Sequence, residues 1–355
     1  MNDILELANQ KLNITHDILI FIYTGPKVGS TSLVSSFRIF GENNYGIIHI
    51  HDEIMLEKLV GINSLTINDI IQYNAQLGRK IYVIDIYRNP IERKISAFFE
   101  KIGSYHFNNF DEIINRFNVN KVIKRFNNIF PYLANGDHYI DKYNINDDLP
   151  EIFPFKQKYL IVEKNGIKYI KLRLKDVDEW ERILSNIFSR TICIVKDYQS
   201  ENKIIGDLFK KFLEKYKIPQ NYLNEILECK YLNYYYSLEE KEEYLNKWNL
   251  KKCENEIYYT TDQYKVYQDI TLENCHIDKV LLHHYIDDGC RCRACIIKRN
   301  RVKHNILTKK YNGERIFHIE AKNELIGKHM IQVKNINNII KKSNKIDSKL
   351  KLFLK

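Results

Sequence analysis

The sequence predicts an α/β fold in which a parallel sheet is flanked by helices in three layers, followed by a small basic C-terminal module of mixed or β-rich structure. Short apolar runs rich in isoleucine alternate with amphipathic segments, which is the pattern of parallel strands joined by crossover helices. The net charge of +10 falls in residues 251–355, which hold 22 Lys and Arg against 12 Asp and Glu, because the residues before them hold 33 of each sign. We therefore expect one domain over residues 1–250 and a second over residues 251–355.

The first expected strand and the turn after it are the most informative stretch. A short helix within residues 1–17 leads into an apolar run, Ile18–Tyr23, that is suited to a buried strand. A tight turn follows, and then a helix with hydroxyl residues in its first turn. These two segments contain Gly25, Pro26, Lys27, Gly29, Ser30, Thr31 and Ser32. Because the N–H groups at a helix start are unpaired and the helix dipole is positive there, this unit predicts an anion-binding site.

A second strand is expected over Asn44–Ile50, and polar residues follow its end. Ligands of open α/β sheets lie beyond the carboxyl ends of the strands, so side chains there are placed for chemistry. His51 is the first candidate for a general base, with His49 and Glu53 as alternatives. A histidine at this position could instead cap the next helix. The chain then continues into a crossover helix over residues 64–78.

A third strand, Ile81–Tyr87, is followed directly by the start of a helix. Asn89 is suited to the N-cap, and Pro90 to the first helical position, where its missing N–H costs little. Arg88 at the end of the strand and Ser96 two turns into the helix can then face the same crevice as the first turn.

The position of the lysine in the first turn separates two kinds of phosphate loop. In the nucleoside triphosphatase loop the lysine follows the second glycine, whereas Lys27 precedes Gly29, so that interpretation fails on spacing. The turn resembles the 5′-phosphosulfate loop of sulfotransferases that use 3′-phosphoadenosine-5′-phosphosulfate (PAPS), which has the pattern P-K-x-G-[ST]-[ST]-x-L. The matching residues are Pro26, Lys27, Gly29, Ser30, Thr31 and Leu33.

The third strand and its helix carry a second motif of the same family. Sulfotransferases bind the 3′-phosphate of PAPS with a segment of the form R-[DN]-P-x-x-R-x-x-S-x-F. The matching residues are Arg88, Asn89, Pro90, Arg93, Ser96 and Phe98. With both motifs in order, the resemblance is strong at these two points and extends loosely over residues 15–250. It implies a P-loop-like sheet and transfer of a sulfuryl group from PAPS to a hydroxyl acceptor, with a glycan as the first candidate.

The resemblance also implies roles for individual residues. Lys27 would neutralise the charge that grows on the bridging oxygen of the donor, and His51 would take the proton of the acceptor. Arg88 and Ser96 would hold the 3′-phosphate. The residues that would hold the 5′-phosphosulfate are Pro26, Lys27, Gly29, Ser30, Thr31 and Ser32. Transfer from PAPS needs no metal.

Residues 154–188 are expected to form a hairpin, a strand and a helix, because Asn165 and Gly166 make a turn signal between two alternating runs. This part resembles the capsular-polysaccharide-type sulfotransferases, in which a P-F-D segment leads into a strand that ends R-x-E-D-L. The chain departs from this pattern at two points. Phe155 is followed by Lys156, and the acidic step after the strand is Lys175-Asp176. Two further regions, 108–150 and 203–248, are expected to be mainly helical. In the second, Ser237 and Glu240 fit a capping box.

The basic C-terminal region contains three closely spaced cysteines, Cys290, Cys292 and Cys295. They are close enough to ligate one ion, so we expect a structural zinc site, with reduced thiols as the alternative. The candidates for the fourth ligand are Cys275, His276, His283 and His284. Alternating apolar residues predict strands over 257–268 and 315–322.

A function of a different class is also open: a non-catalytic nucleotide-fold protein that binds nucleic acid through its basic C-terminal module. Lys27, Arg88 and Ser96 argue against it, because a degenerate nucleotide site has no physical need for them. No apolar run approaches the ~20 residues that span a bilayer, and the first residues lack the pattern of a signal peptide. We therefore expect a cytoplasmic protein without a membrane span.

Overall fold

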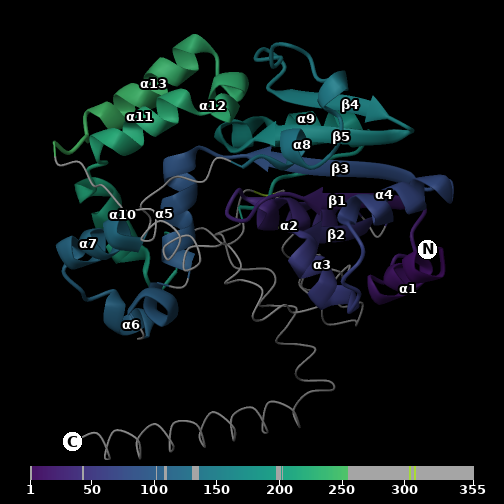
Figure 1. The fold of residues 1–355 in the computed structure, drawn as a ribbon, viewed down its shortest axis with the longest axis horizontal. Helices are drawn as coiled ribbons and strands as arrows, with labels where there is room; N and C mark the ends of the chain where they lie inside the picture. Colours follow the sequence, from purple (N-terminus) through teal and green to yellow (C-terminus); the bar gives the residue numbers. More distant parts are fainter. Residues whose placement is uncertain are drawn as a thin grey trace, which may run out of the picture. The chain divides into compact units, whose positions relative to one another are not determined.

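A five-stranded sheet organises the described part of the chain. The structure is a computed structural model that describes residues 2–41, 44–100, 102–107, 110–129, 136–196, 201, 203–254, 304 and 308. The strands are β1 (Ile18–Tyr23), β2 (Gly46–Ile50), β3 (Lys80–Tyr87), β4 (Tyr159–Lys164) and β5 (Ile167–Arg173). Their order in the sheet is β2-β1-β3-β5-β4, and only β4 runs antiparallel to its neighbour. The fold is therefore α/β with a mostly parallel sheet (Figure 1).

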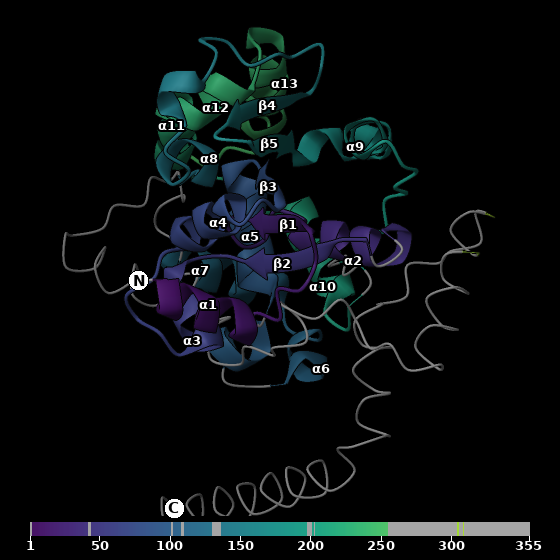
Figure 2. The same ribbon diagram turned by 90° about the vertical axis from the view of Figure 1, so that its right-hand side faces the viewer.

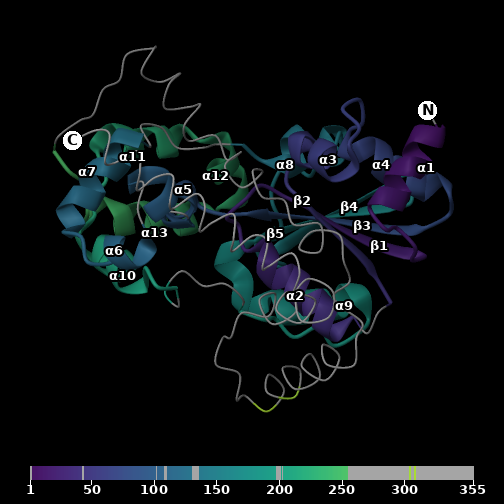
Figure 3. The same cartoon turned by 90° about the horizontal axis from the view of Figure 1, so that it is seen from below.

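Both faces of the sheet are covered by helices, which is why its parallel strands are apolar along nearly their whole length. Figures 2 and 3 show one group of helices on one face and a second group on the other. The first group comprises α1 (Asn2–Lys11), α3 (Glu53–Val60), α4 (Ile67–Gln76) and α8 (His138–Asp141). The second comprises α2 (Ser30–Phe40) and α9 (Trp180–Phe188), which follows the 3₁₀ segment Leu174–Glu179.

The other helices gather beyond the carboxyl ends of the strands (Figures 1 and 3). They are α5 (Pro90–Glu100), α6 (Asp111–Ile114), α7 (Val119–Ile129), α10 (Gly206–Lys215), α11 (Gln220–Glu228), α12 (Lys230–Tyr235) and α13 (Leu238–Asn249). A π-helical turn, Ile102–Phe107, follows α5, and a 3₁₀ turn, Asn146–Asp148, precedes the hairpin. Phenylalanine rings of α5, α7 and α10 form the core of this group, with Phe99 and Phe126 each about 5 Å from Phe212.

The structure confirms the three parallel strands expected in the first part of the sequence. Ile18–Tyr23 has the predicted bounds, and the other two begin within two residues of the expected positions. The hairpin is also confirmed: Asn165 and Gly166 have φ angles of 53° and 75°, as a type I′ turn requires. Because a tight hairpin reverses the chain, β4 runs antiparallel to β5, so the expected hairpin makes the otherwise parallel sheet mixed.

Helix starts also follow the sequence signals. Thr66 and Asp69 form a capping box at α4, and Ser237 and Glu240 form the expected one at α13. Pro90 opens α5 as predicted, but the side chain of Asn89 accepts a hydrogen bond from Tyr236. The region 108–150 is mainly helical among its described residues, as expected, with α6, α7, α8 and the 3₁₀ turn Asn146–Asp148.

The chain divides into two compact units, Met1–Asp288 and Gly289–Lys355, and every helix and strand named above belongs to the first. The cysteine cluster and the two strands expected beyond residue 254 lie outside the described residues, so the C-terminal module and its zinc site stay predictions. Among the helices that the structure describes, none is long and apolar enough to cross a membrane.

Candidate active site

The turn between β1 and α2 lies at the carboxyl edge of the sheet, where a ligand site is expected. Lys27 and Gly29 both have left-handed backbone angles, with φ of 65° and 94°. At Gly29 a side chain is excluded twice, because a Cβ would strain this φ and would lie 2.9 Å from a methyl carbon of Leu174. Gly29 is the N-cap of α2, so it offers no side chain to the first N–H groups of the helix.

Two arginines of the second predicted motif hold this turn through its backbone. Arg88, directly after β3, donates from Nη1 to the carbonyl oxygen of Lys27 at 2.7 Å. Arg93, in α5, donates from Nε to the carbonyl oxygen of Pro26 at 3.1 Å. A Cβ on Gly25 would lie 2.5 Å from the Arg93 guanidinium, so a larger residue here would displace that side chain. The two motifs, which lie some 60 residues apart in sequence, therefore meet at one turn.

The Arg88 contact differs from the simple ion pair that could have explained an arginine at this position. Glu92, one turn into α5, accepts hydrogen bonds from Tyr244, Lys247 and Trp248 of α13. Burial lowers the pKa of the Arg88 guanidinium from its usual range. A half-buried guanidinium gains from an anionic partner, and its five N–H donors are not exhausted by one carbonyl.

The side chain of Lys27 forms an ion pair with Glu100, the last residue of α5. Lys203 binds the same carboxylate oxygen at 3.0 Å. Burial alone would raise the pKa of Glu100, but the two lysines outweigh it and hold the pKa of this carboxyl well below its usual range. Glu100 is therefore ionised and holds the lysine that the sequence assigns to the donor.

Ser96 lies on the face of α5 that is turned toward the loop. Residues at spacings of three and four share one side of a helix, so Arg93, Ser96 and Glu100 are aligned. Arg93 and Glu100, one on each side of Ser96, both contact the loop. Ser96 itself is buried. The structure thus places Arg88 and Ser96 on neighbouring segments beside the same turn.

His51, the candidate general base, follows β2 directly and is buried. Its Nδ1 lies 2.6 Å from the carbonyl oxygen of Thr24, the residue between β1 and the loop. Because a carbonyl oxygen can only accept, Nδ1 carries the proton and Nε2 is the ring nitrogen without one. His138 of α8 donates from Nε2 to the carbonyl oxygen of His51 at 2.6 Å. Burial lowers the pKa of His138, which favours its neutral form.

The two alternative bases have other surroundings. His49 belongs to β2. Its ring is buried and packs edge-on against the ring of His51, with 4.7 Å between the centroids. Glu53 accepts from the Tyr23 hydroxyl at 2.8 Å and from Lys142 at 3.0 Å. Burial opposes ionisation of Glu53, but these bonds lower its pKa and keep it charged. The helix after β2 is capped by the side chain of Asp52, and a capping histidine is not needed there.

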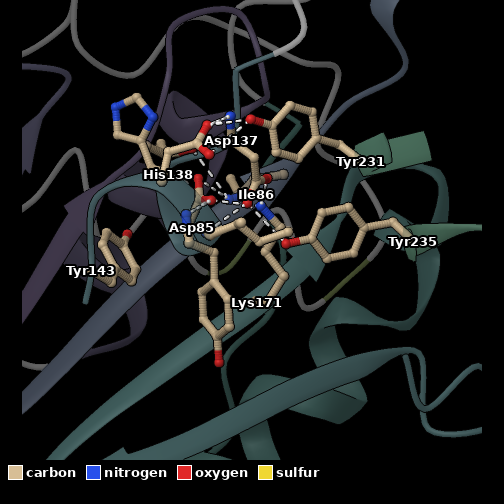
Figure 4. A network of polar contacts seen from close by, with 12 residues as sticks. Asp85, Ile86, Asp137, His138, Tyr143, Lys171, Tyr231 and Tyr235 are labelled. Atoms are coloured by element: carbon tan, nitrogen blue, oxygen red, sulfur yellow. Dashed lines mark hydrogen bonds and ion pairs between the residues drawn. The ribbon is translucent and has the colours of Figure 1, made fainter. Parts of the chain in front are cut away.

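A buried charged network lies beside the loop, and the sequence did not predict it (Figure 4). Lys171 of β5 binds Asp85 of β3 at 2.5 Å and also binds Asp137, the N-cap residue of α8. These three side chains are at most 2% exposed. The backbone N–H of Tyr139 donates to Asp85, and the Tyr235 hydroxyl donates to Asp137 at 2.9 Å. The network therefore joins two strands, α8 and α12.

Two carboxylates share one ammonium group in this network, so their pKa values are shifted in opposite directions. Burial opposes ionisation of Asp85, but Lys171 outweighs it and lowers the pKa of Asp85. Burial and the nearby Asp85 raise the pKa of Asp137. A small cavity lies between the network and the loop; its lining includes Gly25, Asp85, Arg88, Arg93, Asp137 and His138. Residues of the network and both arginines therefore line the same cavity.

One signal in the sequence could have revealed part of the network. Asp85 is the single acidic residue in β3 and lies in the buried part of the strand after Lys80, and a charge at such a position needs a partner. In the sheet it stands directly opposite Lys171, because the register pairs these two residues. Asp137 has no comparable local signal. No group of three or more potential metal ligands occurs among the described residues.

Comparisons with known proteins add no relative to this description. No protein-family model matches the chain, and neither the curated proteins nor the solved structures include a match.

Proposed function

We propose that this chain is a PAPS-dependent sulfotransferase with a P-loop-like nucleotide-binding core. The observation that carries the proposal is the bond from Arg88 to the carbonyl oxygen of Lys27. The two segments that resemble the phosphosulfate and 3′-phosphate motifs are distant in sequence, and this bond brings them into contact at the carboxyl edge of the sheet. Because β1 and β3 are adjacent parallel strands, the segments that follow them meet at this edge, and the Arg88 bond is the specific side-chain contact that joins them.

In this proposal the loop and α2 bind the 5′-phosphosulfate. The N–H groups of Gly29 to Thr31 and the hydroxyls of Ser30, Thr31 and Ser32 hold the phosphate. Arg88 and Ser96 hold the 3′-phosphate, since a planar guanidinium suits bidentate contact with phosphate. Lys27 neutralises the negative charge that grows on the bridging oxygen as the sulfur–oxygen bond breaks.

The acceptor is a hydroxyl compound, and a glycan is the first candidate. Its oxygen forms the new bond to sulfur while the 5′-phosphate of 3′-phosphoadenosine-5′-phosphate leaves with the electron pair of the broken bond. His51 takes the hydroxyl proton on Nε2, the nitrogen left basic by the bond from Nδ1 to Thr24. Positioning and charge stabilisation carry most of the rate enhancement, as in phosphoryl transfer.

The proposal is tested by comparing 3′-phosphoadenosine-5′-phosphate with AMP in calorimetric titration. We expect the wild type to prefer the former by roughly tenfold to over a hundredfold, the ratio that a charge-assisted hydrogen bond of about 1.5–3 kcal/mol produces. Arg88→Ala should remove most of this preference, and Arg88→Lys should restore only part of it, because lysine lacks the planar fork. Arg182→Ala, at an exposed position on α9, is the control. Equal affinities of the wild type for both nucleotides would refute the proposal.

A further inference from the structure

Two lysines from distant segments converge on one carboxylate oxygen. Lys27 lies in the loop before α2, and Lys203 lies shortly before α10. Both contact Oε2 of Glu100, and the Lys203 distance is 3.0 Å. The three side chains are between 16% and 25% exposed. Solvent therefore reaches the cluster, yet the charges are screened less than on an open surface.

Two ammonium groups contact one carboxylate oxygen in this cluster. Lys27 also lies in the turn before α2, and a helix start itself favours anions. A carboxylate oxygen and an oxygen of a phosphate or sulfate group accept the same charge-assisted hydrogen bonds. The place that Glu100 Oε2 occupies is thus a place where an oxygen of an anionic ligand would find both lysines.

We propose that Glu100 is an internal competitor for the anion, and that a phosphate or sulfate group displaces it to reach Lys27 and Lys203. This inference rests on the proposed function, because it concerns the same loop. Lys203 is then an anion-binding residue that belongs to neither sequence motif. Glu100 is a specificity residue: an anion that makes few other contacts does not offset the loss of two ion pairs, whereas a nucleotide held at several points does.

The alternative is that the cluster only braces α5 against the segment around Lys203. The two possibilities differ in what happens when the carboxylate is made neutral. A brace loses stability and leaves anion affinity as it was. A competitor, once neutral, releases two lysines to the ligand, so anion affinity rises.

The experiment measures binding of 3′-phosphoadenosine-5′-phosphate and of inorganic sulfate to the full chain by calorimetry. Glu100→Gln should bind both roughly tenfold more tightly than the wild type, the ratio that corresponds to about 1.4 kcal/mol. Glu57→Gln, an equal change of charge at an exposed position on α3, should leave both affinities unchanged. Equal or weaker binding by Glu100→Gln overturns the inference.

Lys203→Met supplies an independent test that also serves if Glu100→Gln does not fold. A competitor model requires weaker binding of 3′-phosphoadenosine-5′-phosphate, whereas a brace predicts unchanged affinity with a lower melting temperature. The result also separates this inference from the proposed function. A wild type that prefers this nucleotide to AMP, with no gain in Glu100→Gln, refutes only the competitor. A wild type without that preference, whose Glu100→Gln variant still gains affinity for sulfate, refutes only the sulfotransferase.

Discussion

At the scale of single residues, a backbone contact sets the chemistry of a side chain. The carbonyl oxygen of Thr24 fixes the proton of His51 on Nδ1, while the backbone N–H of Thr24 bonds to Ile50 at the end of β2. The hydroxyl of Thr24 accepts from the N–H of Ile86 in β3. One threonine thus fixes the ends of three strands and the tautomer of the proposed base.

Replacement of His51 tests this assignment. His51→Ala should lose roughly 10²–10⁴ in turnover while affinity for 3′-phosphoadenosine-5′-phosphate stays near that of the wild type, because a general base acts on the acceptor and not on the nucleotide. Steady-state kinetics and titration measure the two quantities separately. Full turnover in His51→Ala, together with a loss in His49→Ala or Glu53→Ala, would move the role to one of those residues.

The lowered pKa of Glu100 predicts that the stability of the protein depends on pH. Its folded-state pKa lies below the ordinary value of 4.5, so its ion pairs stabilise the protein above that value. This stabilisation is lost as the pH falls through the lower folded-state pKa. The free energy of unfolding of the wild type should therefore decrease more between about pH 6 and about pH 3 than that of Glu100→Gln. Denaturant titration at both pH values measures this, with Glu57→Gln as the control. Parallel pH profiles of the wild type and Glu100→Gln would contradict the ion pairs.

At the scale of elements, the hairpin fixes the edge of the sheet. Its turn holds two consecutive residues at positive φ, and the strands on either side pair over their full length, from Lys164↔Ile167 to Tyr159↔Leu172. This geometry was readable from the sequence because Asn-Gly is the dipeptide that such a turn prefers. The turn depends on this backbone conformation, whereas the strands on either side also pack into the hydrophobic core.

Substitution of the turn glycine measures that dependence. Gly166 has φ of 75° and open space where a Cβ would stand, so Gly166→Ala should cost about 1–2 kcal/mol through backbone strain alone. Gly136→Ala is the matched control, since its Cβ would also meet open space but its φ is outside the left-handed region. Chemical denaturation of both variants gives the comparison. A similar effect of the two substitutions would show that the turn is not strained by a side chain.

At the scale of the whole first unit, the Asp85–Lys171–Asp137 network ties the centre of the sheet to the helices beyond its carboxyl edge. Asp85 comes from β3, Lys171 from β5 and Asp137 from the start of α8. Burial of such a network costs the desolvation of every charge, so the intact network adds little net stability. Removal of one member, however, leaves the others buried without a partner and lowers the free energy of unfolding.

Removal of the shared lysine should therefore be severe. Lys171→Met leaves two buried carboxylates without their cation and should lower the free energy of unfolding by about 3–5 kcal/mol. Addition of Asp137→Asn to this variant should recover part of the loss, because one of the two charges is gone. Lys168→Met, at an exposed position of the same strand, should change stability by less than about 1 kcal/mol. Urea titration measures all three. A mild effect of Lys171→Met would mean that the carboxylates are already protonated.

The sequence could predict local elements of this unit but not the contacts between its distant segments. The strands, the loop and the start of α5 depend on neighbouring residues, and their patterns were sufficient to locate Lys27, Arg88 and Ser96 on one edge. The partners of those residues are set by distant segments. Nothing near Glu100 indicates Lys203, and nothing near Asp85 indicates Asp137, because only the packed helices bring them together.

The two arginine contacts with the loop have a directional consequence. A trans peptide unit is planar, and its C=O and N–H bonds point in opposite directions. Since the oxygens of Pro26 and Lys27 are turned toward the guanidinium groups, the amide hydrogens of Lys27 and Val28 are turned away from them. Arg88 and Arg93 therefore orient two peptide units of the loop. They set the direction of the loop's N–H donors whether or not a ligand is present.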